Sequence, residues 1–162
     1  MVQHSLFRRR ALLVALMLTP LVWAACSSSS RQAAGGAPGQ PVYGAASSEG
    51  AIQAFLDAAA AGDYPRMWAV FGTEDGAAVE RFGVAEIEAR MVVLARLLRH
   101  DGYEMQVANL AAYGPDRVRY EVRLQGTRKG AVVVPVVTVP DGRARWFVEQ
   151  LDMDALTAGS FP

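Results

Sequence analysis

The hydrophobic pattern of this chain changes its period near Gly102, and this change constrains the fold more than any other feature of the sequence. Before Gly102, apolar residues recur at intervals of three and four, as they do on one face of a helix. After Gly102, they alternate with polar residues, as they do on one face of a strand. This order predicts an α+β domain in which N-terminal helices pack on an antiparallel sheet.

Three helices are predicted before Gly102. The first is capped by Ser48 and stopped by Gly62, with an apolar face of Ile52, Phe55, Leu56 and Ala59. Asp63 is positioned to cap a short second helix that runs through Trp68 and tolerates Pro65 in its first turn. The third and longest covers Val84–Arg99. The stretch 72–83 between the last two is predicted to be a polar loop, with one helical turn as an alternative for part of it.

Four strands are predicted after Gly102, and the short turns between them favour an antiparallel meander. Their expected ranges are Tyr103–Ala112, Arg117–Leu124, Val132–Val139 and Arg143–Leu151. The stretch 131–139 is apolar on both faces. Its outer face is therefore expected to be covered either by a partner subunit or by the C-terminal tail. Pro135 in the middle of this strand requires a bulge or a free edge.

The first residues have the three parts of a bacterial export signal. The basic residues Arg8, Arg9 and Arg10 precede an apolar run over 11–23, which is shorter than the roughly 20 residues needed to cross a bilayer. The tetrapeptide Trp23-Ala24-Ala25-Cys26 resembles the lipobox of bacterial lipoproteins. The resemblance implies cleavage before Cys26 and attachment of diacylglycerol to its sulfur. Two alternatives are an ordinary cleavage site beside a passenger cysteine and an uncleaved anchor.

The predicted organisation has four parts. Residues 1–25 are the signal peptide, and residues 26–48 are the lipidated Cys26 with a tether rich in Ser, Gly and Ala that cannot bury enough apolar surface to fold. Residues 49–154 form the domain, and residues 155–162 form a C-terminal tail. The lipid on Cys26 is then the membrane contact, and the domain is expected outside the cytoplasm, in the bacterial cell envelope.

Composition excludes several classes of function. The 16 basic and 16 acidic residues balance, and removal of the three arginines in the signal leaves a mildly acidic chain, which argues against nucleic-acid binding. Cys26 is the only cysteine, so no intramolecular disulfide or thiolate metal site can form. With two His residues in the chain, no metal-ligand spacing occurs, and no motif for a cofactor is present.

Three helices followed by four antiparallel strands, with Gly62-Asp63-Tyr64 leading into Trp68, resemble the nuclear transport factor 2-like superfamily. The resemblance covers about residues 49–154. It implies a cone-shaped fold in which a curved four-stranded sheet wraps around a long helix. The superfamily includes ketosteroid isomerases, polyketide cyclases and dehydratases as well as many binding and accessory domains, so the fold does not choose among them.

The candidate pocket residues are aromatic and are expected near the mouth of the cone, although aromatics at such spacings more often fill a core. They are Tyr64, Trp68, Tyr103, Tyr120 and Trp146. No catalytic residue is assigned. The pair His100-Asp101 is better explained as the end of a helix, where a histidine is favoured by the helix dipole.

The sequence favours a non-catalytic envelope lipoprotein that binds a small apolar ligand or a protein partner, with dimerisation expected through the sheet. The alternative is an isomerase, dehydratase or cyclase that uses a carboxylate inside the cone. The acids that could serve are Asp63, Asp101, Glu104 and Glu149. A third possibility is a structural accessory subunit whose cone is filled.

Overall fold

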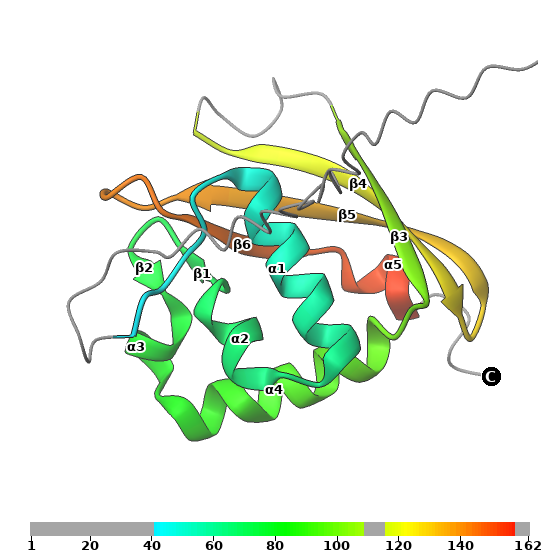
Figure 1. The fold of residues 1–162 in the computed structure, drawn as a ribbon, viewed down its shortest axis with the longest axis horizontal. Coiled ribbons are helices and arrows are strands. Elements are labelled where there is room, and N and C mark those ends of the chain that lie inside the picture. The colour runs from blue at the N-terminus through cyan, green and yellow to red at the C-terminus, as the bar shows by residue number, and fades with distance from the viewer. Residues whose placement is uncertain (1–40, 109–115, 158–162) are drawn as a thin grey trace, which may run out of the picture. The chain divides into compact units, whose positions relative to one another are not determined.

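The long helices precede the four strands of the main sheet along the chain, as the change of period predicts (Figure 1). The computed structural model describes residues 41–108 and 116–157, which all belong to one compact unit. The helices before the sheet are α1 (Ser48–Ala61), α2 (Tyr64–Ala69), α3 (Ala78–Phe82) and α4 (Val84–Leu97). The strands of the sheet are β3 (Gly102–Val107), β4 (Val118–Thr127), β5 (Gly130–Pro140) and β6 (Trp146–Leu151).

The four strands are ordered β3-β4-β5-β6 and every neighbouring pair is antiparallel, which confirms the predicted α+β fold with an antiparallel meander. The register pairs Tyr103 with Leu124 and Tyr120 with Val136. Residues at alternate positions of β4 and β5 therefore point to the same face, and this face is buried. The part of β3 predicted beyond residue 108 lies outside the described residues.

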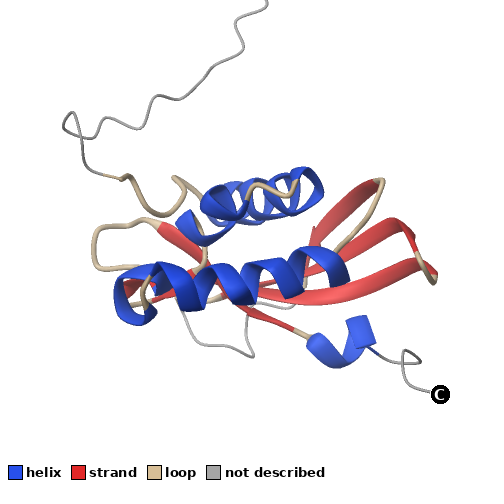
Figure 2. Ribbon diagram, turned by 90° about the horizontal axis from the view of Figure 1, so that it is seen from below, coloured by secondary structure: helices blue, strands red, loops and turns tan. Residues whose placement is uncertain are grey.

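The long helices α1 and α4 cover the buried face of the sheet (Figure 2). Helix α1 contributes Ile52, Phe55 and Leu56, each about 1% exposed, and α4 contributes Ile87 and Met91, which have no exposed surface. They pack in one cluster with inner residues of the sheet such as Val122, Leu124, Val134 and Val136. Burial of these side chains, at roughly 1.5–3 kcal/mol each, is the main contribution to the stability of the fold.

The capping residues agree with the sequence at two of the three helix ends for which it predicts one in α1 and α2. Gly62 ends α1 in the left-handed conformation with φ 68°. Asp63 caps α2 by accepting a hydrogen bond from the Arg66 amide at 3.1 Å, and Pro65 lies in the first turn. The N-cap of α1 is Ser47 and not Ser48, since Ser47 accepts the bond from the Gly50 amide.

The stretch 72–83, predicted as a polar loop with one possible helical turn, contains a short helix and also a hairpin that was not predicted. It contains a two-stranded hairpin, β1 (Gly72–Thr73) with β2 (Gly76–Ala77), followed by α3. Helix α3 is a fourth helix before the sheet, and its Val79 is buried in the core. Gly72 is required in the hairpin, because a Cβ at this position would lie 2.2 Å from the Gly76 carbonyl oxygen.

The folded domain extends beyond both predicted boundaries. On the N-terminal side, within the predicted tether, Ala45 exchanges two backbone hydrogen bonds with Trp146 at 2.8 and 2.9 Å. On the C-terminal side, α5 (Met153–Thr157) occupies the start of the predicted tail. Leu156 of α5 is 7% exposed and belongs to the core. Both segments are therefore parts of the domain.

The outer face of β5 divides into an exposed part and a buried part. Val133 is 41% exposed, whereas Val137 and Val139 are 4% and 1% exposed. Leu156 of α5 belongs to the core cluster and lines a hollow with residues of α1 and α4, so this side chain of the predicted tail lies on the helix side of the sheet and not on the outer face. A partner subunit against Val133 remains a prediction.

Pro135 is accommodated at the end of β6. Its carbonyl oxygen accepts a hydrogen bond from the Asp152 amide at 3.0 Å, just past the last residue of β6. The nitrogen and the carbonyl of one residue point to the same side of a strand, so the position without an amide hydrogen faces the end of β6 and not β4. Pro135 thus lies in a central strand, but at a position where the pairing with β6 has ended and no amide hydrogen is needed.

Candidate functional site

A cleft opens at the end of the sheet where β4 turns into β5, the end to the right in Figure 1. We call this the cleft end. The C-terminal ends of α1 and α4, the β4–β5 hairpin and α5 surround the cleft, which has a volume of about 810 Å³. The lining residues are Ala59, Ala60, Ala61, Gly62, Tyr64, Ala95, Arg96, Leu97, Arg99, Thr127, Arg128, Lys129, Val132 and Leu156.

The floor of the cleft is apolar and is built largely from small side chains. Ala59 and Ala95 are 5% and 9% exposed and line the cleft from the ends of α1 and α4. Leu156, 7% exposed, lines it from α5. Short side chains at the ends of two helices leave a hollow that larger ones would fill. The volume falls in the range usual for small-molecule sites.

The rim of the cleft is cationic. Arg96 lies in the last turn of α4 and Arg99 just past its end, and Arg128 and Lys129 come from the tip of the β4–β5 hairpin. All four residues are exposed. The Lys129 ammonium donates a hydrogen bond to the Leu156 carbonyl at 3.1 Å and so ties the hairpin to α5. Among the described residues that line the cleft, none is Asp or Glu.

The geometry of the hairpin holds Arg128 and Lys129 at the rim. The Thr127 hydroxyl donates to the Gly130 carbonyl at 2.6 Å and accepts from the Lys129 amide at 3.3 Å, which closes the turn. Gly130 has φ 87°, a conformation that favours glycine. The bond between Thr127 at the end of β4 and Gly130 at the start of β5 thus fixes the turn that carries Arg128 and Lys129.

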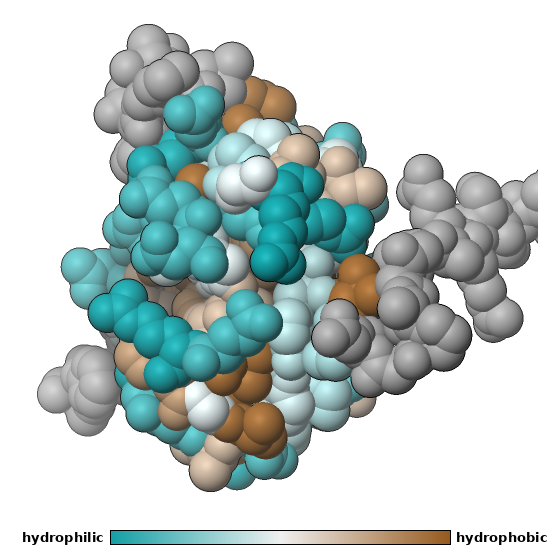
Figure 3. All heavy atoms as spheres, turned by 90° about the vertical axis from the view of Figure 1, so that its left-hand side faces the viewer, coloured by the Kyte–Doolittle hydropathy of each residue, from teal (hydrophilic) through white to brown (hydrophobic). Residues whose placement is uncertain are grey.

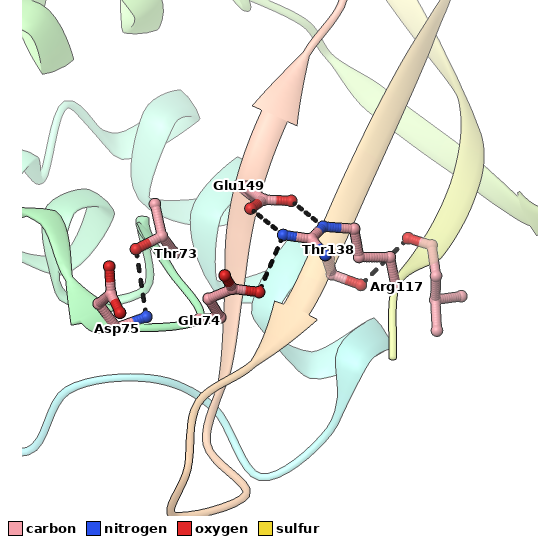
Figure 4. Close-up of polar contacts among 7 residues, drawn as sticks. Thr73, Glu74, Asp75, Arg117, Thr138 and Glu149 are labelled. Atoms are coloured by element: carbon pink, nitrogen blue, oxygen red, sulfur yellow. Dashed lines mark hydrogen bonds and ion pairs between the residues drawn. The ribbon is translucent and has the colours of Figure 1, made fainter. Parts of the chain in front are cut away.

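The opposite end of the sheet, where β5 turns into β6, is closed by polar contacts, and we call it the closed end. Arg117 donates from Nε and Nη2 to the two carboxylate oxygens of Glu149 at 2.8 and 2.9 Å, and from Nη2 to Glu74 at 3.1 Å (Figure 4). The hydrogen bonds to Glu149 and its negative charge raise the pKa of Arg117. This two-sided pairing joins the segment just before β4 to β6 and to the β1–β2 turn.

Three hydroxyl groups form a second contact at the closed end. Ser48 Oγ lies 2.7 Å from Thr138 Oγ1 and donates to the Tyr120 hydroxyl at 3.0 Å. Thr138 has no exposed surface. The contact fixes the start of α1 on β4 and β5. Figure 3 views the molecule from this end, where hydrophilic side chains cover the upper part and a hydrophobic area lies below them.

The five predicted pocket aromatics are not brought together. Tyr64 lines the cleft. Trp68 and Trp146 pack against the core, and Tyr120, 7% exposed, is part of it. The Tyr103 hydroxyl donates to Asp57 of α1 at 3.1 Å, and burial together with the negative charge of Asp57 raises its pKa to about 12. Tyr103 therefore stays neutral at physiological pH and serves as a link between β3 and α1.

The four acids proposed for an enzyme lie apart from the cleft. Asp63 is exposed and caps α2, and Asp101 is exposed at the start of β3. Glu104 is exposed and accepts a hydrogen bond from Gln125 at 3.1 Å. Glu149 is paired with Arg117, as described above. None of these carboxylates is available inside a water-excluded pocket.

His100 is held by the main chain. Its Nδ1 lies 2.6 Å from the Leu98 carbonyl, so this nitrogen carries a proton and donates it to the carbonyl oxygen. The imidazole also meets the Tyr103 ring edge to face, with 5.5 Å between centroids. Its neighbour Asp101 is exposed. Helix α4 ends at Leu97 and not at Arg99 as predicted, so His100 lies just past the helix, where these contacts give it a structural role.

A second, more open groove of about 700 Å³ lies between α4 and β6. Its apolar lining includes Val93 of α4, which is 55% exposed, and Leu151 of β6. Both acids in the lining, Glu86 and Glu149, are engaged in ion pairs with arginines. The groove therefore offers apolar surface without an available charge.

The four rim cations are the part of the site that the sequence analysis missed. A signal for them exists: Arg96 and Arg99 lie at the end of the predicted third helix, two residues separate Arg99 from Gly102, and Gly102 pairs with Gln125 near the hairpin. In a meander, the start of the first strand must lie beside the end of the second. Topology alone could thus have placed both pairs of cations together.

Within residues 41–108 and 116–157, no group of three or more His, Cys, Asp or Glu side chains could share a metal ion. In the same residues, no helix has the length and apolar character needed to cross a membrane. Cys26 and the predicted signal lie outside the described residues. The chain matches no protein-family model, no curated protein and no solved structure with which it was compared.

Proposed function

We propose that this chain is a lipoprotein of the bacterial cell envelope whose domain binds a small ligand, with an apolar portion, in the cleft and performs no chemistry on it. The observation that carries the proposal is a cleft of about 810 Å³ with an apolar floor and, among its described lining residues, no carboxylate. Acid-base catalysis of the isomerase or dehydratase type needs a carboxylate or a similar base beside the substrate.

The fold is proposed to be a variant of the nuclear transport factor 2-like cone. Support comes from the order of elements, with helices before a four-stranded antiparallel meander, and from Gly62 and Asp63 between the first two helices. The variant has an added hairpin and helix over 72–82 and a C-terminal helix, α5, at the cleft.

The anchor is proposed to be a lipid on Cys26. Support comes from the apolar run over 11–23, the small residues Ala24 and Ala25, and the serines that follow the cysteine. A single acyl chain binds a membrane only marginally, whereas two or more chains hold a protein stably. A lipidated Cys26 would therefore keep the domain at the membrane surface.

The anchor is tested by feeding radioactive palmitate to bacteria that express the full chain, Cys26→Ser, or the matched control Ser27→Ala. The native chain and the control are expected to carry the label and to sediment with membranes. Cys26→Ser is expected to lose the label and to appear in the soluble envelope fraction. Membrane attachment of Cys26→Ser without label would instead identify an uncleaved apolar anchor.

Ligand binding is tested on the full chain in nanodiscs of zwitterionic lipid, by following the methyl NMR signals of Leu97, Val132 and Leu156 as 1-octanol is added. Saturable shifts are expected for the native chain. Ala61→Trp, which places a large ring in the cleft, should abolish them, whereas Ala85→Trp, on an exposed part of α4 outside the cleft, should not. The absence of saturable shifts in the native chain would overturn the proposal.

A further inference from the structure

The charges of the cleft indicate the kind of ligand that it takes. Arg96, Arg99, Arg128 and Lys129 line one cleft, and the described lining includes no residue of opposite charge. A surface that serves only solubility usually intersperses both signs, because like charges placed together repel. Here two pairs of cations, from elements more than 25 residues apart in sequence, are brought to one place.

The fold itself makes little use of three of these cations. No ion pair reaches Arg96, Arg99 or Arg128 from the residues that the structure describes, although Arg90 and Arg117 are both paired. The dipole of α4 favours cations in its last turn, which accounts for Arg96 but not for Arg99, which lies past the end of the helix. Nor does it account for Arg128, which lies on the hairpin.

The cations and the apolar surface occupy different depths. The four cationic residues are exposed, whereas Ala59, Ala95 and Leu156 on the floor are at most 9% exposed. A ligand that satisfies both surfaces carries its charge at one end and its apolar part at the other. Guanidinium groups bind carboxylates and phosphates through paired hydrogen bonds, so these are the anions to which the rim is suited.

We propose that the ligand of the cleft is an anionic amphiphile, with a carboxylate or phosphate headgroup at the arginine rim and a single apolar chain on the floor. The inference rests on the proposed ligand-binding function and names the chemical class of that ligand. Arg96, Arg99 and Arg128 contact the headgroup, and the side chains of Ala59, Ala95 and Leu156 contact the chain.

The test compares four probes on the full chain in zwitterionic nanodiscs, with the methyl signals of Leu97, Val132 and Leu156 as the readout. The probes are octanoate, octyl phosphate, octylammonium and 1-octanol. Octanoate or octyl phosphate is expected to bind at least about tenfold more tightly than 1-octanol, and octylammonium more weakly. The preference between the two anions then tells a carboxylate ligand from a phosphate ligand.

Substitution of the rim separates charge from shape. The triple variant Arg96→Gln, Arg99→Gln, Arg128→Gln is expected to lose about tenfold or more in affinity for the anionic probe and to keep its affinity for 1-octanol. Arg143→Gln, an exposed arginine in the β5–β6 turn, serves as the control and should change neither. Added salt should weaken the binding of the anionic probe and leave the binding of 1-octanol unchanged, because exposed charges are screened within about 10 Å at 0.1 M.

The outcomes distinguish the two proposals. If no probe shifts the cleft signals, the proposed binding function fails. If all four probes bind alike, or the triple variant binds the anion as tightly as the native chain, the function stands and the anionic class is wrong. If inorganic phosphate competes with octyl phosphate at equal concentration, the apolar chain contributes nothing and the amphiphile is overturned.

Discussion

The arginines at the two ends of the sheet differ in whether they form ion pairs. At the closed end, Arg117 forms hydrogen bonds with two carboxylates and joins three segments of the chain. At the cleft end, Arg96, Arg99 and Arg128 have no ion pair among the described residues. At the closed end the polar groups form contacts within the protein, whereas at the cleft end they face solvent around an apolar hollow.

This difference predicts that polar substitutions will affect stability differently at the two ends of the sheet. Polar groups inside a fold are normally satisfied, as those of Ser48, Tyr120 and Thr138 are, and removing one partner is costly. Exposed charges without partners contribute little to stability. Substitutions at the closed end should therefore change stability, and substitutions of the cleft arginines should leave it nearly unchanged.

The largest effect is expected from Gly44→Ala at the closed end. Gly44 has φ 72°, and an added Cβ would lie 2.8 Å from both Arg145 Cβ and Phe147 Cζ. The strained backbone and the overpacking together should lower the free energy of unfolding by about 3 kcal/mol. Urea unfolding followed by circular dichroism measures this loss. Gly142→Ala, where a Cβ has no neighbour within 4 Å, should change it by less than ~0.5 kcal/mol.

Thr138→Val should have an intermediate effect. It keeps the shape of a side chain that is fully buried but leaves Ser48 without one of its partners, at a cost of about 1 kcal/mol. Ser48→Ala and the double variant complete a cycle of unfolding measurements. Losses that add without coupling would show that the two hydroxyls do not stabilise each other.

The smallest effect is expected at the cleft end. Arg99→Gln with Arg128→Gln should change the free energy of unfolding by no more than ~0.5 kcal/mol, with a slight gain because two like charges are removed. Arg117→Gln is the contrasting variant and should lower the urea midpoint clearly. A loss above ~1 kcal/mol in the cleft variant would mean that its arginines hold the fold, and the contrast between the ends would disappear.

The sequence predicts the larger elements because their signals are local. The period-two alternation from Val118 to Leu124 and the apolar spacing around Ile87 and Met91 specify a strand and a helix without reference to the rest of the chain. Gly62 and Asp63 likewise act through their own backbone and the next few amides.

The errors occur where distant contacts decide the local structure. Ser47 and Ser48 are equivalent as capping residues in sequence, but the Ser48 hydroxyl is taken by Tyr120 and Thr138 of the sheet. Helices α3 and α5 each have five residues, too few to be stable alone, and they depend on the burial of Val79 and Leu156. Helix α5 nevertheless has a local signal in the sequence, since Asp152 is a typical N-cap residue and accepts hydrogen bonds from two amides of the first turn.

The candidate site was less predictable than the fold. Aromatic residues suggested a pocket, but large apolar side chains are also what a core requires, and Tyr120 and Trp146 pack in or against the core. The cleft instead uses small residues, Ala59 and Ala95, beside exposed arginines. None of these residues has a distinctive pattern in the sequence, because the cleft forms only when distant segments fold next to one another.

The Ser48 contact also bears on the order in which the chain can fold. The hydroxyl at the start of α1 meets partners 72 and 90 residues further along the sequence. Contacts of such long range close large loops, and they slow folding because the chain loses entropy before it gains the contact. A chain emerging from synthesis cannot complete this end until β5 is available. This end of the domain can therefore form only after Thr138 has been synthesised.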